Sequence, residues 1–184
     1  MGRNVYVKAV CAWEPGSPDP DFREVLTPME ARRLGRLLKL AVWTSQQALA
    51  QAGISMPDAV ITATDFGCME NTEAFLKALK GVDDAPMRPV HFMQSTHNTI
   101  GSLIAIRLGC HGYNATYSHR GASLQSALLD AWTQISLGDI DTALVGAFDE
   151  ESALCPQARA LSMALTADPQ AALYELKRPE LCGN

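Results

Sequence analysis

The sequence predicts an α/β domain in which a mixed, mostly parallel sheet is covered by helices on both faces. Two short segments, residues 58–64 and 141–148, are apolar and rich in β-branched residues, as strands buried on both faces of a parallel sheet are. Segments with apolar residues at helical spacing lie between the strands, and this alternation is typical of parallel sheets. The chain has 184 residues, 47% of them apolar, which is enough for one sizeable core.

The N-terminal part begins with a strand and continues in two helices. Residues 4–13 show an alternating pattern rich in valine, which favours a strand. Thr27 and Glu30 flank Pro28 in the arrangement of a helix start, with threonine as N-cap and glutamate in the capping-box position. Apolar residues at helical spacing over residues 37–52, followed by a glycine, predict a second and longer helix.

The middle of the chain continues the alternation, and the end is less regular. A loop containing Pro86 and Pro89 is expected between two of the helices, because proline interrupts helices and strands. The remaining predicted elements are helices at residues 70–80, 96–108 and 122–137, a strand at residues 115–118, a helix at residues 156–165 and an edge strand at residues 171–176.

Charge and cysteine usage exclude several classes of function. The net charge of −5 argues against non-specific binding of nucleic acid. No apolar run approaches the ~20 residues that a membrane span needs, and the N-terminus lacks the apolar stretch of a signal peptide, so we expect a cytoplasmic protein. The five cysteines and four histidines show no metal-ligand spacing. We therefore expect reduced thiols, no metal site and no cofactor.

Residues 89–150 resemble the N-terminal half of β-ketoacyl-acyl-carrier-protein synthases, which belong to the thiolase superfamily. The resemblance rests on Asn98 within QSTHNTIG, on the GYNAT segment that begins at Gly112, and on the Gly138–Asp139 turn into a strand. Residues 91–99 and 110–121 are most similar to the chain-length-factor-like homologues of aryl polyene and flexirubin-type pigment clusters. The resemblance implies one thiolase-like N-terminal half over residues 1–184, with the C-terminal half absent.

The resemblance also implies that the catalytic nucleophile is missing. In the family a cysteine lies at a strand-to-helix turn, where the helix N-terminus lowers the pKa of its thiol. Counting without gaps from Gly112 and from Gly138 leads to the same position, and Gly121 occupies it. Glycine cannot form a thioester, and the two histidines that the family's C-terminal half supplies are absent as well. We therefore assign no catalytic residue.

Three neighbours of Gly121 were weighed as substitutes for the cysteine. Ser118 and His119 are expected at the end of the strand, where adjacent side chains face opposite sides and cannot pair. Ser123 is expected to serve the helix start, as serine often does. Cys155 lies in a predicted loop where nothing nearby lowers the pKa of its thiol, so it too is left without a catalytic role.

Two groups of residues are candidates for contacts with partners. The first group could face a subunit interface or an acyl tunnel and consists of His97, Asn98, Thr116, Ser118, His119 and Arg120. For His97 and Asn98, hydrogen bonding within the chain is the alternative. The second group could dock the acidic surface of an acyl carrier protein and consists of Arg32, Arg33, Arg36 and Lys39. The alternative is that these four side chains form a solvated helix face. In the superfamily the strand at residues 115–118 pairs across the dimer axis.

Three functions remain open from the sequence. The first is a non-catalytic, chain-length-factor-like subunit that partners an active β-ketoacyl synthase in fatty acid or polyketide biosynthesis, as a heterodimer, or alternatively forms a homodimer. The second is an acyltransferase that condenses acyl and malonyl thioesters as part of a complex. The third is a module that binds carrier proteins alone. The absence of a cysteine at position 121 favours the first.

Overall fold

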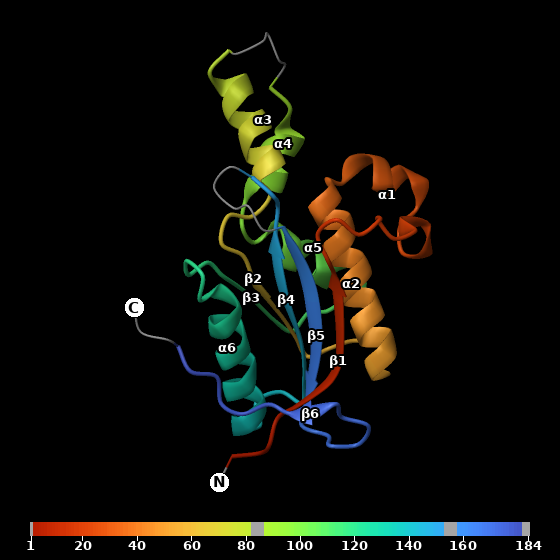
Figure 1. Cartoon of the computed structure of the whole chain (residues 1–184), viewed down its shortest axis with the longest axis vertical. Helices are drawn as coiled ribbons and strands as arrows, with labels where there is room; N and C mark the ends of the chain where they lie inside the picture. Colours follow the sequence, from red (N-terminus) through yellow and green to blue (C-terminus); the bar gives the residue numbers. More distant parts are fainter. Residues whose placement is uncertain (1, 82–86, 153–157, 182–184) are drawn as a thin grey trace.

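A computed structural model describes residues 2–81, 87–152 and 158–181. Six strands and six α-helices alternate along these residues (Figure 1). The strands are β1 (Tyr6–Trp13), β2 (Ala59–Ala63), β3 (Tyr113–Tyr117), β4 (Thr142–Asp149), β5 (Arg159–Thr166) and β6 (Tyr174–Glu175). The helices are α1 (Pro28–Arg33), α2 (Arg36–Ala52), α3 (Met69–Leu79), α4 (Pro89–Ser95), α5 (Thr99–Leu108) and α6 (Ser123–Leu137), and a 3₁₀ turn, η1 (Phe22–Glu24), precedes α1.

The strands form one mixed sheet with the order β3-β2-β4-β5-β1-β6. β2 pairs in parallel with β3 and with β4, whereas β5 pairs antiparallel with both β4 and β1. β1 to β4 therefore run in one direction, as the prediction of a mostly parallel sheet requires. β5 enters between β4 and β1 in the opposite direction, and with β6 it makes three of the five pairings antiparallel.

Helices cover both faces of the sheet, as predicted. On one face α2 and α5 bury Leu38 and Ile100 against Val60 and Phe148. On the other face α6 packs Ala131 against the sheet residues of a second cluster. Figure 1 shows α6 on the opposite side of the sheet from α2. The buried and nearly unbroken apolar composition of β2 and β4 follows from this double coverage.

Several local predictions are confirmed. Thr27 and Glu30 form the expected capping box at the start of α1, with the Glu30 backbone N–H donating to the Thr27 hydroxyl at 3.3 Å. The helix predicted over residues 37–52 is α2, and the edge strand predicted at residues 171–176 is the short strand β6, which pairs with β1.

Two local predictions are wrong. The helix predicted at residues 156–165 is β5 from Arg159 onward, because that segment completes the sheet between β4 and β1. The loop expected around Pro89 is instead the helix α4, in which Pro89 occupies the first turn, the one place where a helix tolerates proline.

The helices α3 and α4 pack on each other and project beyond the end of the sheet (Figure 1). Phe75 and Phe92 join them, with ring centroids 5.3 Å apart. In the described part of the chain, no helix is long and apolar enough to cross a membrane.

Candidate functional site

Four segments meet at the carboxyl end of the parallel strands. They are the loop after β2, the turn between β3 and α6, the last residue of β4 and the first residue of β5. The antiparallel register places Asp149 of β4 directly opposite Arg159 of β5. Ligand sites of open α/β sheets usually lie at this edge.

Gly121 lies in the turn between β3 and α6, as the sequence predicts. It is exposed, and its φ of +77° is a conformation that residues with side chains rarely adopt. A Cβ atom at this position would meet no atom within 4 Å, so space alone does not dictate glycine here. The preceding residue, Arg120, also has a positive φ of 31°, which marks a strained turn.

The carboxylate of Asp65 caps this turn from the loop after β2. Its Oδ1 atom accepts a hydrogen bond of 3.0 Å from the Gly121 backbone N–H and another from the Ser123 hydroxyl. Its Oδ2 atom lies 3.8 Å from the guanidinium of Arg159. The Asp65 carboxylate thus occupies the position at the α6 N-terminus where backbone N–H groups could otherwise bind an anionic ligand.

Ser123 and His119 do not form a catalytic pair. The Ser123 hydroxyl is buried, donates to Asp65 and accepts from the His119 backbone N–H at 2.8 Å. It does not cap α6 as expected, because Ala122 is the N-cap and no side chain caps the helix. The His119 Nδ1 atom lies 3.2 Å from the Ser126 hydroxyl, which itself donates to the Ala122 carbonyl at 3.0 Å. Ser118 lies one residue beyond β3, in an exposed loop and not in the strand as predicted.

Asp149 organises the loop after β2 and is almost fully buried. Its Oδ1 atom accepts hydrogen bonds from the Thr64 hydroxyl and the Asp65 backbone N–H, both at 2.7 Å, and from the Phe66 backbone N–H at 3.0 Å. Its Oδ2 atom accepts from Arg159 at 2.7 Å. Asp149 therefore fixes the backbone from which Asp65 reaches Gly121.

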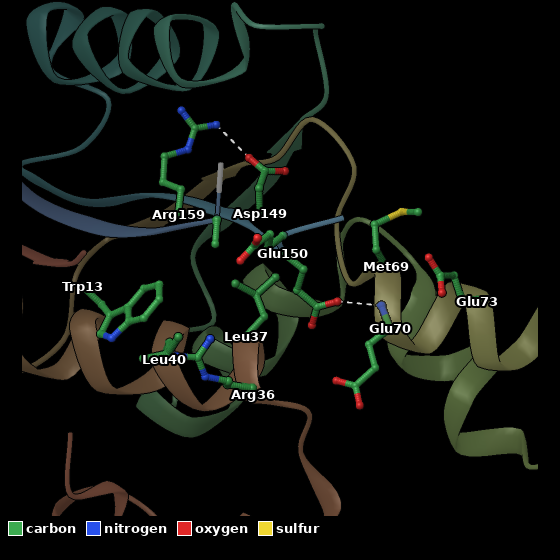
Figure 2. A pocket seen from close by; sticks show the side chains of 12 residues that line it. Trp13, Arg36, Leu37, Leu40, Met69, Glu70, Glu73, Asp149, Glu150 and Arg159 are labelled. Atoms are coloured by element: carbon green, nitrogen blue, oxygen red, sulfur yellow. Dashed lines mark hydrogen bonds and ion pairs between the residues drawn. The ribbon is translucent and has the colours of Figure 1, made fainter. Parts of the chain in front are cut away.

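Two cavities flank Arg159 at this edge. One, of about 300 Å³, has Trp13, Leu37 and Leu40 on one side and acidic residues on the other (Figure 2). The other, of about 440 Å³, lies on the side of Asp65 and Leu161. Neither has Gly121 in its wall.

Glu150 is one of the acids that line the first cavity. Its carboxylate accepts a hydrogen bond of 2.7 Å from the Glu70 backbone N–H at the start of α3 (Figure 2). Burial, reinforced by the nearby charges of Glu70 and Glu73, raises the pKa of Glu150 above its ordinary value. Among the described residues, no group of three or more His, Cys, Asp or Glu side chains is arranged to hold a metal ion.

The comparisons with known proteins identify the family. The sequence model described as "Beta-ketoacyl synthase, N-terminal domain" matches residues 2–172. The chain belongs to this family. None of the curated proteins matches the sequence.

Solved structures share the fold of this ketosynthase-family chain at low identity. A chain of the ketosynthase ApeO in complex with its chain length factor ApeC, from Xenorhabdus doucetiae, superposes with a TM-score of 0.72 at 20% identity, over 89% of this chain and 79% of that one. A chain of the AntDE:AntF complex, a type II polyketide ketosynthase with its acyl-carrier protein, superposes with a TM-score of 0.77 at 16% identity, over 94% of this chain and 65% of that one. A chain of the ishigamide ketosynthase/chain length factor superposes with a TM-score of 0.73 at 16% identity, over 90% of this chain and 59% of that one. The chain therefore spans less than two thirds of the last two.

The interface candidates of this ketosynthase-family chain fall into two places. His97 and Asn98 are exposed between α4 and α5, and in the described structure neither side chain makes a hydrogen bond. Thr116 instead faces α5, where its hydroxyl lies 2.8 Å from that of Thr62. A Cβ atom at Gly101 would lie 2.9 Å from the Thr62 hydroxyl and 3.4 Å from that of Thr116. The other candidates, Ser118, His119 and Arg120, line the exposed loop before α6.

The carrier-docking candidates divide in the same way. Arg36 pairs with Asp19 at 2.6 Å and lies 4.5 Å above the ring of Trp13. Lys39 lies 5.9 Å from the ring of Phe22, so both side chains have intramolecular roles. The remaining two, Arg32 and Arg33, are exposed at the end of α1 and make no ion pair within the described residues.

Asp65, Asp149 and Arg159 were not singled out from the sequence as site residues. Asp65 carried a usable signal, because a polar residue directly after a buried parallel strand lies at the ligand-binding edge of the sheet. Arg159 could not be found, since its segment was predicted to be a helix. Cys155 lies outside the described residues. Burial raises the pKa of another thiol, Cys68, to about 12, so that thiol is not a nucleophile.

Proposed function

We propose that this chain is a non-catalytic, chain-length-factor-like subunit that forms a heterodimer with an active β-ketoacyl synthase of fatty acid or polyketide biosynthesis. The observation that carries the proposal is the turn before α6. Gly121 stands at the family's nucleophile position, and the Asp65 carboxylate already occupies its backbone N–H. No thiol at this position could attack an acyl thioester, and the Gly121 backbone N–H is not free to bind the resulting oxyanion.

The residues around the turn provide no substitute for the cysteine. The Ser123 hydroxyl lies at the helix N-terminus, but it is buried and committed to Asp65, and His119 reaches Ser126 instead. Ser123 is only 1% exposed, so an acyl thioester has no access to its oxygen.

The sequence motifs and the matched structures favour a role in a pigment or polyketide pathway. The motifs at residues 91–99 and 110–121 resemble the aryl polyene branch, and the matched structures include complexes of a ketosynthase with a chain length factor. The chain that matches in the ApeO–ApeC complex is covered to 79%, which supports our proposal that residues 1–184 form one half-thiolase domain.

The test combines acylation with partner binding. The purified chain is incubated with acyl- and malonyl-carrier-protein thioesters, and intact mass spectrometry is expected to find no adduct. Light scattering after gel filtration is expected to find a 1:1 complex with the full-length ketosynthase encoded in the same gene cluster.

Two outcomes would contradict the proposal. A stable acyl adduct would favour an acyltransferase, and loss of that adduct in Ser123→Ala would locate it on the buried hydroxyl. A monomer that does not bind the ketosynthase would exclude the partner role.

A further inference from the structure

The helices α3 and α4 form an arm with few buried contacts to the rest of the chain. They pack on each other beyond the end of the sheet (Figure 1). Within the described residues of α3 and α4, Asn71 alone is buried. Elements with so little buried surface open locally at a lower free energy than the core does. The contacts at the base of the arm therefore determine how often it opens.

Glu150 joins the base of the arm to the sheet from its position directly after β4. The helix α3 has no side-chain cap of its own at the N-cap residue Cys68. The Oε2 atom of Glu150 supplies this cap, since it accepts a hydrogen bond of 2.7 Å from the Glu70 backbone N–H (Figure 2). Glu150 thus connects the first turn of α3 to the end of β4.

The surroundings of Glu150 favour its neutral form. Its Oε1 atom is buried and has no hydrogen-bond donor among the described residues. Burial, together with the charges of Glu70 and Glu73, outweighs the backbone hydrogen bonds and raises the pKa of Glu150 above 4.5. A neutral carboxyl keeps the bond from the Glu70 N–H through its carbonyl oxygen, whereas the ionised form places a charge on the buried oxygen as well.

No cation pairs with this carboxyl among the described residues. The charged groups that line the same cavity are Arg36, Glu70, Glu73, Asp149, Glu151 and Arg159. The Arg36 guanidinium pairs with Asp19 at 2.6 Å. That of Arg159 pairs with Asp149 at 2.7 Å. The neighbouring thiol of Cys68, whose pKa is about 12, stays neutral at physiological pH.

We propose that Glu150 is a pH-sensitive latch for the α3–α4 arm. In its neutral form it holds the first turn of α3 against the end of the sheet, and its ionisation favours opening of the arm. Opening exposes the carboxyl to water, where it ionises more readily. The latch is therefore tightest below pH 4.5 and weakens as the pH rises through the raised pKa of Glu150. This device does not depend on the proposed heterodimer.

Hydrogen exchange of the full chain, followed by mass spectrometry, tests the latch. Protection factors, which correct for the intrinsic effect of pH on exchange, are compared for peptides of α3 and α2 at about pH 5 and about pH 7.5. We expect the protection of α3 to fall at least about threefold between the two conditions, while that of α2 stays constant. Glu150→Gln stays neutral and should keep the protection of α3 at its pH 5 level in both.

Two control variants separate Glu150 from its neighbours. Glu151→Gln changes an exposed carboxyl that lines the same cavity, and it should keep the pH dependence of the wild type. Histidine changes charge in the same pH range. The Nδ1 atom of His91 lies 3.1 Å from the Asn71 side chain within the arm, and His97 lies beside Gly67 at its base. His91→Asn combined with His97→Asn should also keep the wild-type dependence.

Three results would overturn the proposal. They are a protection of α3 that does not change with pH in the wild type, a wild-type dependence that persists in Glu150→Gln, and its loss in the histidine double variant. If Glu150→Gln does not fold, NMR titration of the Glu150 carboxyl in the wild type decides, because a midpoint at or below 4.5 refutes the latch. These measurements need no ketosynthase, so the latch and the proposed function can fail separately.

Discussion

Gly121 combines an unusual backbone conformation with an empty space around its missing side chain. A residue with a Cβ at a φ of +77° costs about 1–2 kcal/mol, and nothing within 4 Å adds a steric term. Gly121→Cys should therefore fold, with a loss of about 1–2 kcal/mol in the free energy of unfolding measured in urea. Gly121→Ala is the matched control and should lose the same amount.

We further expect Gly121→Cys to gain no condensation activity, because the backbone N–H of residue 121 beside the new thiol is already bound by the Asp65 carboxylate. Conversion of acyl and malonyl thioesters by this single variant, followed by mass spectrometry, would refute the non-catalytic interpretation.

The position of Gly121 was predictable because two motifs in the sequence fix its distance to either side. The network around Gly121 was not predictable, because Asp65 and Arg159 lie about 40 to 60 residues from it in the sequence and such contacts leave no local pattern. The sequence also could not show that the carboxylate of Asp65 would fill the donor at the turn.

At the level of elements, α1 and α5 are joined through Glu30. The Thr27 hydroxyl and backbone N–H, and then the guanidinium of Arg107, hold the pKa of Glu30 at about 2, below its ordinary 4.5. A lowered pKa means that the carboxylate stabilises the fold above pH 4.5 and that this stabilisation is lost as the pH falls through about 2.

Glu30→Gln should consequently lower the Tm at pH 7, and its difference from the wild type should shrink as the pH is lowered from about 4.5 towards 2. Thermal melts followed by circular dichroism over this range check the prediction. Glu180→Gln removes an exposed carboxylate and is the control. A difference between Glu30→Gln and the wild type that does not change with pH would show that the charge of Glu30 is not involved.

Helices with clear caps were the elements best predicted, as α1 and α2 show. β5 was missed because its sequence is rich in alanine, leucine and methionine, which are good helix formers. The segment becomes a strand because it enters a gap between two existing strands, and tertiary pairing overrides its local preference.

For the whole molecule, the alternation of strands and helices was sufficient to predict the common direction of β1 to β4 and the coverage of both faces. It could not predict that β5 separates β4 from β1, because the pairing partner of β1 is encoded far along the chain. The position of β5 is therefore the part of the architecture that required the structure.

The distribution of basic residues leads to a prediction for the intact chain. Arg32 and Arg33 make no ion pair with the described residues, whereas Arg36 and Lys39 have partners within the chain. Arg32→Glu combined with Arg33→Glu should weaken binding of acyl carrier protein about tenfold at low ionic strength, and the effect should shrink as salt is added.

Surface plasmon resonance at several salt concentrations measures this effect. Lys177→Glu combined with Arg178→Glu, near the other end of the sheet, is the control and should leave binding unchanged. Equal loss in both double variants would mean that net charge, and not the α1 surface, attracts the carrier protein.

The pairing of β1 with β5 also determines the order in which this protein can fold. The two strands are separated by about 150 residues of sequence, so β1 has no neighbour in the sheet while the segments between them are being synthesised on the ribosome. The unit of β2, β3 and β4 can assemble before that, since its pairings span shorter stretches. Nascent chains halted before β5 should therefore keep the N-terminal strand open to proteases and chaperones.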